Sequence, residues 1–244
     1  MNPYWQGKPV LVTGAGGFIG SHLVEALVSM GAKVRVFIRY TSRNDLGLLT
    51  CLPPDTFDKI EVLAGDLRDL PAVQQAVKGT SHIFHLGALI AIPYSYLHPS
   101  EVVETNVIGS LNVFLAARDS GIQRLVHTST SEVYGTAQRV PIDEAHPLQG
   151  QSPYSASKIA ADKVAESFYR SYGVPLVTLR PFNTYGPRQS DRAVIPTIIA
   201  QALTKEVIHL GNLDALRDLT YVADTVSGFL KVAEVQGIEG QTFN

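Results

Sequence analysis

A glycine-rich segment near the start of the chain constrains the fold more than any other feature. Residues 10–20 read VLVTGAGGFIG, an apolar run followed by three spaced glycines, and a helical pattern then continues to Met30. In a strand that turns into a helix, Gly14 permits the tight turn, Gly17 lets backbone N–H groups approach a pyrophosphate, and Gly20 lets helix and strand pack closely. Because the positive end of the helix faces the phosphates, the segment predicts dinucleotide binding.

Strand-like and helical segments alternate along the rest of the chain. This rhythm is typical of a parallel sheet with helices on both faces. The predicted strands are 10–14, 34–38, 60–65, 82–87, 124–129, 174–180, 207–210 and 240–244. The predicted helices are 18–30, 69–78, 100–119, 153–172, 197–204 and 222–235. The fold class is therefore α/β, a Rossmann-type doubly wound parallel sheet, with a dinucleotide-binding domain over 1–180 and a partial substrate-binding lobe over 181–244 that is interleaved with the last strands.

Composition excludes several classes of protein. The chain has 244 residues, of which 17% are charged, and a net charge of −2, which gives no reason to expect nucleic acid or an anionic membrane as a partner. The single cysteine, Cys51, excludes an intrachain disulfide and fits a reducing compartment. No apolar run reaches membrane-spanning length and the first residues lack the pattern of a signal peptide, so we expect a cytoplasmic protein. No metal site is predicted.

The residues that follow the predicted strands indicate the cofactor. An acidic residue usually ends the second strand of a NAD-binding unit, but here Arg39 stands at that position. An arginine there suits a 2′-phosphate and favours NADP over NAD. The alternative is that Arg39 belongs to a solvated basic loop with no role in binding. Asp66 follows the third strand, where it can bond adenine or cap the next helix. After the fourth strand, His85 fits a core position better than a catalytic one. The predicted cofactor contacts are Gly14, Gly17, Phe18, Ile19, Gly20, Arg39, Asp66, Leu67, Leu86, Gly87, Ala88, Asn106, Tyr154 and Lys158.

Two segments carry groups suited to hydride-transfer chemistry. Residues 128–135, TSTSEVYG, follow the fifth strand at the edge where open α/β sheets bind ligands. Tyr154 and Lys158 lie four residues apart and share one face of a predicted helix. A lysine ammonium near a phenol lowers the phenol pKa from about 10, and the tyrosinate can take a proton from an alcohol as hydride leaves the same carbon. Thr130 can hydrogen-bond that alcohol, or it is only a β-branched strand residue.

Together these motifs resemble a known family. TGAGGFIG, TSTSEVYG and YSASK look like the extended short-chain dehydrogenase/reductases of the NAD-dependent epimerase/dehydratase family, which act on nucleotide sugars. RPFNTYGP at 180–187 and RDLTYV at 217–222 also resemble family signatures. The resemblance implies tightly bound NAD or NADP and a catalytic set of Thr130, Tyr154 and Lys158. It also implies that Asn183 contacts the sugar or its diphosphate and that Arg217 contacts the diphosphate.

Glu132 distinguishes among the reactions of this family. Glu132 resembles a glutamate of the sugar-nucleotide 4,6-dehydratases. In those enzymes the sugar is first oxidised at C4, and the glutamate then takes the proton from C5. Water leaves from C6 and hydride returns to C6, which gives a 4-keto-6-deoxy sugar. Ser131 stands where many dehydratases have an aspartate, which departs from the deoxythymidine-glucose branch and looks like the GDP-mannose branch. Both residues join the predicted catalytic set. A 4-epimerase, a UDP-glucuronate decarboxylase and a non-catalytic NAD(P)-binding subunit remain alternatives.

The sugar and the assembly are predicted from weaker patterns. Residues 90–103 contain no arginine or lysine, which favours a neutral hexose over a glucuronate. The IPYSY run at 92–96 resembles dehydratases of N-acetylglucosamine nucleotides, and the predicted substrate contacts are Ser95, Thr130, Asn183 and Arg217. Helices 100–119 and 153–172 carry apolar residues on more than one face, which predicts a homodimer. Family members usually continue several tens of residues past a segment like 240–244, so we expect an incomplete substrate lobe.

Overall fold

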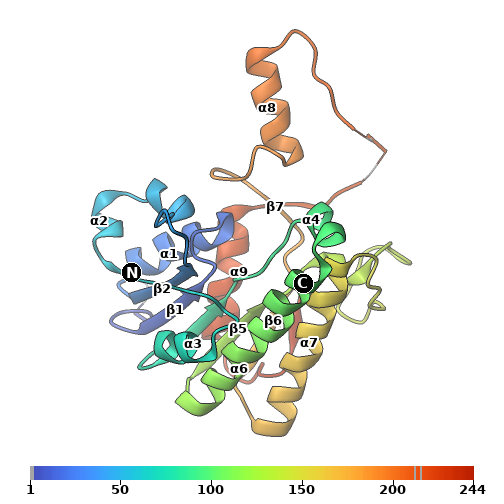
Figure 1. The fold of residues 1–244 in the computed structure, drawn as a ribbon. Helices are drawn as coiled ribbons and strands as arrows, with labels where there is room; N and C mark the ends of the chain where they lie inside the picture. Colours follow the sequence, from blue (N-terminus) through green and yellow to red (C-terminus); the bar gives the residue numbers. More distant parts are fainter. Residues whose placement is uncertain (1–2, 212, 215) are drawn as a thin grey trace.

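The computed structural model describes residues 3–211, 213–214 and 216–244, and within them the chain forms a doubly wound parallel sheet (Figure 1). The strand order is β3-β2-β1-β4-β5-β6-β9, and every neighbouring pair is parallel. The strands are β1 (Pro9–Thr13), β2 (Lys33–Arg39), β3 (Ile60–Gly65), β4 (His82–His85), β5 (Arg124–Thr128), β6 (Leu176–Leu179) and β9 (Thr242–Phe243). This order confirms the predicted α/β fold class.

Helices cover both faces of the sheet and form two apolar cores. On one face, α1 (Phe18–Ser29) and α9 (Val222–Glu234) enclose a core that includes Trp5, Phe84 and Phe229. On the other face, α3 (Leu70–Val77), α6 (Gly109–Ser120) and α7 (Pro153–Tyr172) enclose a core built around Phe114, Leu125 and Phe168. Burial of both faces explains why the central strands read as continuous apolar runs.

Shorter elements lie near the carboxyl edge of the sheet. The predicted helix 100–119 is interrupted by a π-helical stretch, which lies between α5 (Pro99–Val103) and α6. A small parallel sheet of β7 (Asn183–Tyr185) and β8 (Leu219–Tyr221), which the sequence did not predict, lies apart from the main sheet. The remaining elements are η1 (Gly47–Cys51), α2 (Pro54–Phe57), α4 (Ile92–Leu97), α5 (Pro99–Val103), the π-helical η2 (Glu104–Ile108), η3 (Ser131–Tyr134), β7 (Asn183–Tyr185), α8 (Val194–Thr204) and β8 (Leu219–Tyr221).

The predicted strand at 207–210 is wrong. Among the described residues this segment pairs with no strand; Val207 and Ile208 are exposed, and the backbone of His209 bonds the Gln201 side chain instead. A strand depends on ladder hydrogen bonds to a neighbouring strand, and the described residues form none with this segment. The apolar run was therefore misread as a strand.

Local capping fixes where α7 begins, which matters for the site. Ser152 is the N-cap and forms a reciprocal capping box with Ser155, while Pro153 occupies the first turn. The helix ends at Gly173, which has φ +66°. These signals place Tyr154 and Lys158 within the first two turns, against the end of β5.

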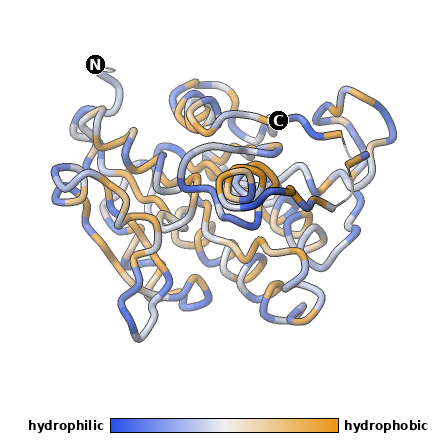
Figure 2. The backbone as a smooth tube through the Cα atoms, turned by 90° about the horizontal axis from the view of Figure 1, so that it is seen from above, coloured by the Kyte–Doolittle hydropathy of each residue, from blue (hydrophilic) through white to orange (hydrophobic). Residues whose placement is uncertain are grey.

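The helix α8 stands away from the sheet and its layers (Figure 1). None of its residues is buried, and Figure 2 shows that hydrophobic residues run along it as well as through the sheet. Among the described residues, none of the helices combines the length and apolar character needed to cross a bilayer.

Candidate active site

The glycine turn forms a close contact between the ends of β1 and β4. Gly14 has φ +69°, and a Cβ there would lie 2.7 Å from the backbone nitrogen of Gly87. A Cβ on Gly20 would lie 2.4 Å from the Gly14 carbonyl oxygen. Gly17 is the N-cap of α1 and brings no side chain over the helix terminus. The backbone is thus as tightly packed as a dinucleotide turn requires, and the structure fits a pyrophosphate at this point.

A cavity of about 150 Å³ adjoins this turn. Six predicted cofactor residues line it, together with aromatic and apolar side chains from β2 and the glycine that ends β3. The lining residues are Gly14, Phe37, Ile38, Arg39, Gly65, Asp66, Leu67, Arg68, Gly87, Ala88, Leu89 and Thr105. Phe18 and Ile19 start α1 beside the turn, and Leu86 packs against the core beneath it. The cavity has the position of an adenosine pocket at the ends of β1 to β4.

The charged residues of this cavity are paired within the protein. Arg39 Nη2 lies 3.4 Å from Glu101 on α5, and Asp66 binds Arg68 at 2.6 Å. The hydrogen bond from Arg68 is the main cause that lowers the Asp66 pKa, so this residue is a carboxylate at neutral pH. The N-cap of α3 is Asp69, which excludes the capping alternative for Asp66.

Asn106 connects the cofactor side of the site to α7. It lies in η2, is fully buried, and bonds both backbone groups of Leu89 as well as Ser157 Oγ. π-Helical segments often occur at functional sites. His85 is also buried, with ring nitrogens on Thr13 and Ser110, and burial lowers its pKa well below the usual value. It is a satisfied core histidine, as expected.

Tyr154 and Lys158 lie together in the buried floor of the site, but the expected coupling of their charges is wrong. Burial raises the pKa of Tyr154 to about 12, the charge of Glu132 acts in the same direction, and a hydrogen bond from Thr130 opposes both. The Lys158 ammonium donates to the Thr128 carbonyl oxygen at 2.7 Å. Burial also lowers the pKa of Lys158 to about 8. Desolvation therefore outweighs the expected stabilisation of a phenolate.

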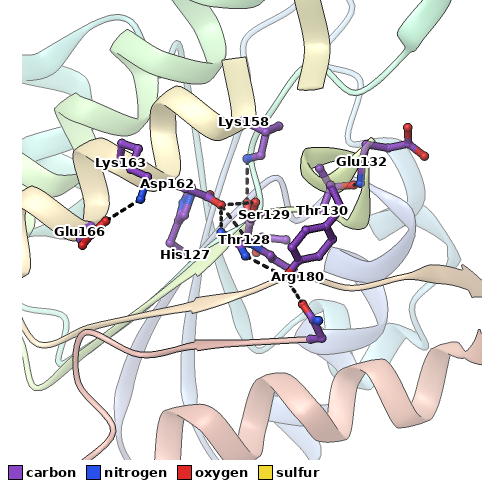
Figure 3. Close-up of polar contacts among 12 residues, drawn as sticks. His127, Thr128, Ser129, Thr130, Glu132, Lys158, Asp162, Lys163, Glu166 and Arg180 are labelled. Carbon is purple, nitrogen blue, oxygen red and sulfur yellow. Dashed lines mark hydrogen bonds and ion pairs between the residues drawn. The ribbon is translucent and has the colours of Figure 1, made fainter. Parts of the chain in front are cut away.

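Glu132 and Ser131 lie in η3, directly after β5. Glu132 is exposed, and its backbone N–H donates to Thr130 Oγ1 at 3.2 Å. Figure 3 shows its side chain pointing away from Asp162 and Lys158 on α7. Its negative charge nevertheless contributes to raising the pKa of the Tyr154 phenol. Ser131 is half-buried and its N–H donates to the Pro181 carbonyl oxygen.

A buried polar cluster behind Lys158 was missed at the sequence level. Its centre is Asp162, which binds His127, Ser129 and Arg180 (Figure 3). Asp162 follows Lys158 by four residues, so its place on the same helix face was available from spacing alone. Its partners lie at the ends of β5 and β6, and only the tertiary fold brings those strand ends next to α7.

The predicted substrate residues are spread over three segments. Ser95 on α4 is fully buried and its hydroxyl donates to the Ile92 carbonyl oxygen. Asn183 pairs with Leu219 in the β7–β8 sheet, and Arg217 is exposed two residues before Leu219. Asn183 thus lies on β7 and Arg217 shortly before β8, the strand that pairs with β7, whereas Ser95 is buried on α4. These three assignments stay predictions.

Comparison with known proteins is consistent with this geometry. The family model described as GDP-mannose 4,6 dehydratase matches residues 11–242. An uncharacterized UDP-glucose epimerase of Bacillus subtilis is 35% identical over 248 residues, covering 96% of this chain and 75% of the relative.

Solved structures give the same picture. A UDP-N-acetylglucosamine 4-epimerase from Methanobrevibacter ruminantium superposes with a TM-score of 0.88 at 31% identity, covering 97% of this chain and 76% of that one. A dTDP-glucose 4,6-dehydratase from Streptomyces venezuelae, solved with NAD bound, superposes with a TM-score of 0.83 at 32% identity, covering 96% and 74%. Dehydratases and epimerases are therefore both among the similar proteins.

Proposed function

Since the chain belongs to the NAD-dependent epimerase/dehydratase family of nucleotide-sugar enzymes, we propose that it is a nucleotide-sugar 4,6-dehydratase. The observation that carries this proposal is the Glu132 carboxylate, which lies beyond Thr130 and within electrostatic reach of the Tyr154 phenol. The reaction needs a base for the C5 proton, one sugar carbon from the C4 hydroxyl, and the proposal assigns this role to Glu132. The product is a 4-keto-6-deoxy sugar nucleotide.

The glycine turn and its cavity fit NAD(P), and relatives solved with NAD support this cofactor. The turn would hold the pyrophosphate, while Arg39 and Asp66 would lie at the adenosine end. When bound, NAD(P) supplies the hydride acceptor for oxidation at C4 and the hydride donor at C6. Arg39 favours NADP, although Glu101 already pairs with its guanidinium.

The chain's own residues would move the protons. Tyr154 would first lose its own proton and, as the phenolate, accept the proton of the C4 hydroxyl, while Thr130, whose hydrogen bond lowers the phenol pKa, would orient that oxygen. Lys158 places a positive charge beneath the phenol while its ammonium donates to Thr128. Once C4 is a ketone, the C5 hydrogen is acidic because the carbanion is an enolate, and Glu132 removes it. Glu132 would pass this proton to the C6 hydroxyl, which leaves as water, and the Ser131 hydroxyl would donate a hydrogen bond to it; solvent supplies the proton that C5 takes up after hydride returns to C6.

We further propose an N-acetylglucosamine nucleotide as the substrate. The sequence of α4, IPYSYL, resembles that of dehydratases with such substrates, and residues 90–103 contain no arginine or lysine to pair with a C6 carboxylate. Asn183 and Arg217, at the β7–β8 sheet, are the proposed contacts for the sugar and its diphosphate.

A 4-epimerase is the second candidate, because Glu132 is exposed and an epimerase needs no acid at this position. The two reactions differ in their effect on C5. Incubation in D₂O with NAD(P) and UDP-N-acetylglucosamine, GDP-N-acetylglucosamine or GDP-mannose should give a keto sugar with deuterium at C5 and no net reduction of the cofactor. A 4-epimer with unlabelled C5 and its 6-hydroxyl intact contradicts the dehydratase proposal.

The variant Glu132→Gln makes the same test on the protein. It should abolish dehydration and C5 exchange while NAD(P) binding persists. The control is Glu166→Gln, a half-exposed glutamate on α7 paired with Lys163 and Arg170, which should leave both unchanged. If Glu132→Gln and Glu166→Gln dehydrate the substrate at the same rate, Glu132 is not the base that takes the C5 proton.

We also propose a homodimer built on α6 and α7, which lie side by side (Figure 1). Large apolar side chains are exposed on η2 and α7, among them Ile108, Tyr169 and Tyr172. Light scattering at micromolar concentration should give twice the chain mass, and a monomer contradicts the proposal.

A further inference from the structure

A buried carboxylate, Asp162, lies behind the proposed catalytic groups and takes no part in the steps above. It follows Lys158 by one helical turn, and its side chain is 5% exposed. Oδ1 lies 3.1 Å from His127 Nε2, and Oδ2 receives hydrogen bonds from Ser129 Oγ at 2.9 Å and from Arg180 at 2.9 and 3.1 Å. So many partners around one buried group indicate a fixed position.

Two of these partners, His127 and Ser129, flank the Thr128 carbonyl group at the end of β5. His127 and Ser129 are two residues apart, so their side chains leave the strand on the same face. Between them is Thr128, whose carbonyl oxygen receives the Lys158 ammonium (Figure 3). Ser129 is also followed directly by Thr130. One carboxylate thus sets both the lysine's acceptor and the strand end that carries the threonine.

The same carboxylate is the anion among buried cations. Around Lys158 lie Tyr154 and Asp162 on α7, His85 on β4, His127 on β5, and Arg180 after β6. Burial keeps both histidines neutral, whereas Arg180 carries a charge and donates to Asp162. Without Asp162, two cations would remain in a desolvated region with no counter-charge, which is strongly unfavourable.

We propose that Asp162 is a positioning residue that keeps Lys158 charged against the Thr128 carbonyl group and fixes the strand end carrying Thr130. This inference rests on the proposed function only in its expected effect on kcat. The charge of Lys158 can be measured without turnover.

The test compares Asp162→Asn with Glu166→Gln, an equal carboxylate-to-amide change on the exposed side of the same helix. The Lys158 side-chain resonance, assigned by its absence in Lys158→Met, is followed by ¹³C NMR as a function of pH. In Asp162→Asn its titration midpoint should move down by at least about one pH unit, a tenfold change in the protonation constant. The kcat at pH 8 should fall at least about fivefold with a smaller change in KM, because the protonated fraction of the lysine falls from about one half to about one tenth. Glu166→Gln should change neither.

A second variant separates position from charge and also covers the case in which Asp162→Asn does not fold. Ser129→Ala removes one hydrogen bond to Asp162 and alters no charge. The Lys158 midpoint should stay at its wild-type value while kcat falls several-fold. An unchanged kcat overturns the positioning of the strand end.

A folded Asp162→Asn protein with an unshifted Lys158 midpoint and the kcat of Glu166→Gln overturns the proposal and leaves Asp162 a structural residue. Absence of any keto-sugar product from the wild-type protein is a different result: it refutes the proposed function, while the NMR midpoint still decides the role of Asp162.

Discussion

The floor of the site and the described residues of 183–221, which the proposed function puts on the substrate side and which we call the substrate-facing segment, are built in opposite ways. Tyr154 and Lys158 are 7% and 4% exposed, and the Lys158 ammonium donates a hydrogen bond to the Thr128 carbonyl oxygen at the end of β5. Across the site, α8 has no buried residue, and Leu203 on it is 81% exposed. Acid–base groups are therefore placed by the core, whereas the substrate-facing segment has little packing of its own.

The contrast teaches where substitutions should matter. In the floor, removing one group changes burial, charge and position together, so effects should be large and should depend on pH. In the substrate-facing segment, a change of one side chain alters little of the folded state, so its effects should be confined to ligand binding.

The largest effect is expected from Tyr154→Phe, which removes the proton acceptor and preserves the ring. Dehydratase turnover should fall by about 10² to 10⁴, the range for loss of a general acid–base group. NAD(P) affinity, measured by fluorescence titration, should stay within a few-fold because the ring remains. The control is Tyr172→Phe on the same helix, exposed at 57%, which should be silent. Comparable turnover in the two variants would place the base elsewhere.

The next effect concerns the stability of the floor as pH changes. The pKa of Lys158 is about 8 in the folded protein and near 10.5 when unfolded. Between these values the unfolded chain binds more protons, so this residue's contribution to the free energy of unfolding rises with pH and is unfavourable at pH 7. Lys158→Met should therefore be more stable than wild type at pH 7, and the difference should shrink by up to about 3 kcal/mol by pH 10.5.

Urea unfolding of both proteins at the two pH values measures this difference. Lys163→Met serves as the control, because its ammonium lies on the solvent side of α7 and is 63% exposed. Its stability relative to wild type should not change with pH beyond a few tenths of a kcal/mol, as expected for an exposed ion pair. A pH-independent difference for Lys158→Met as well would mean that its burial carries no electrostatic penalty.

The same contrast separates what the sequence predicted from what it did not. The glycine turn, the strand runs of the sheet and the Ser152 cap follow from local rules, so the fold and the starting point of α7 were predictable. The direction of the Tyr154 pKa was not, since spacing shows that Lys158 is near and says nothing of how deeply both groups are buried. The partners of Asp162 come from β5 and the end of β6, which only tertiary structure brings together.

The substrate-facing segment was predicted less well for a related reason. The apolar run at 207–210 has the composition of a strand, and apolar runs in the sheet were read correctly by that criterion. Strand formation depends on a partner, and the short strands that do pair there, β7 and β8, are only three residues each. Periodicity cannot identify elements so short.

A smaller effect is expected at the glycine turn. In Gly14→Ala the new Cβ meets the backbone of Gly87, and φ +69° adds strain, so NAD(P) affinity should fall at least about tenfold, or about 1.4 kcal/mol. Gly121→Ala is the matched control, with φ +61° and no atom within 4 Å of the new Cβ. Both variants should lose about 1 to 2 kcal/mol of stability through the left-handed backbone, but only Gly14→Ala should lose cofactor, as measured by calorimetric titration.

The smallest effect is expected from Leu203→Gln on α8. Glutamine is nearly as good a helix former as leucine, and the side chain is 81% exposed, so the free energy of unfolding should stay within about 0.5 kcal/mol of wild type. For comparison, Leu23→Ala in the core beneath the glycine turn should lose about 2 to 5 kcal/mol. Urea denaturation measures both. A loss above about 1 kcal/mol in Leu203→Gln would show that this face of α8 is covered in solution, and the contrast between the two regions would then hold only for the isolated chain.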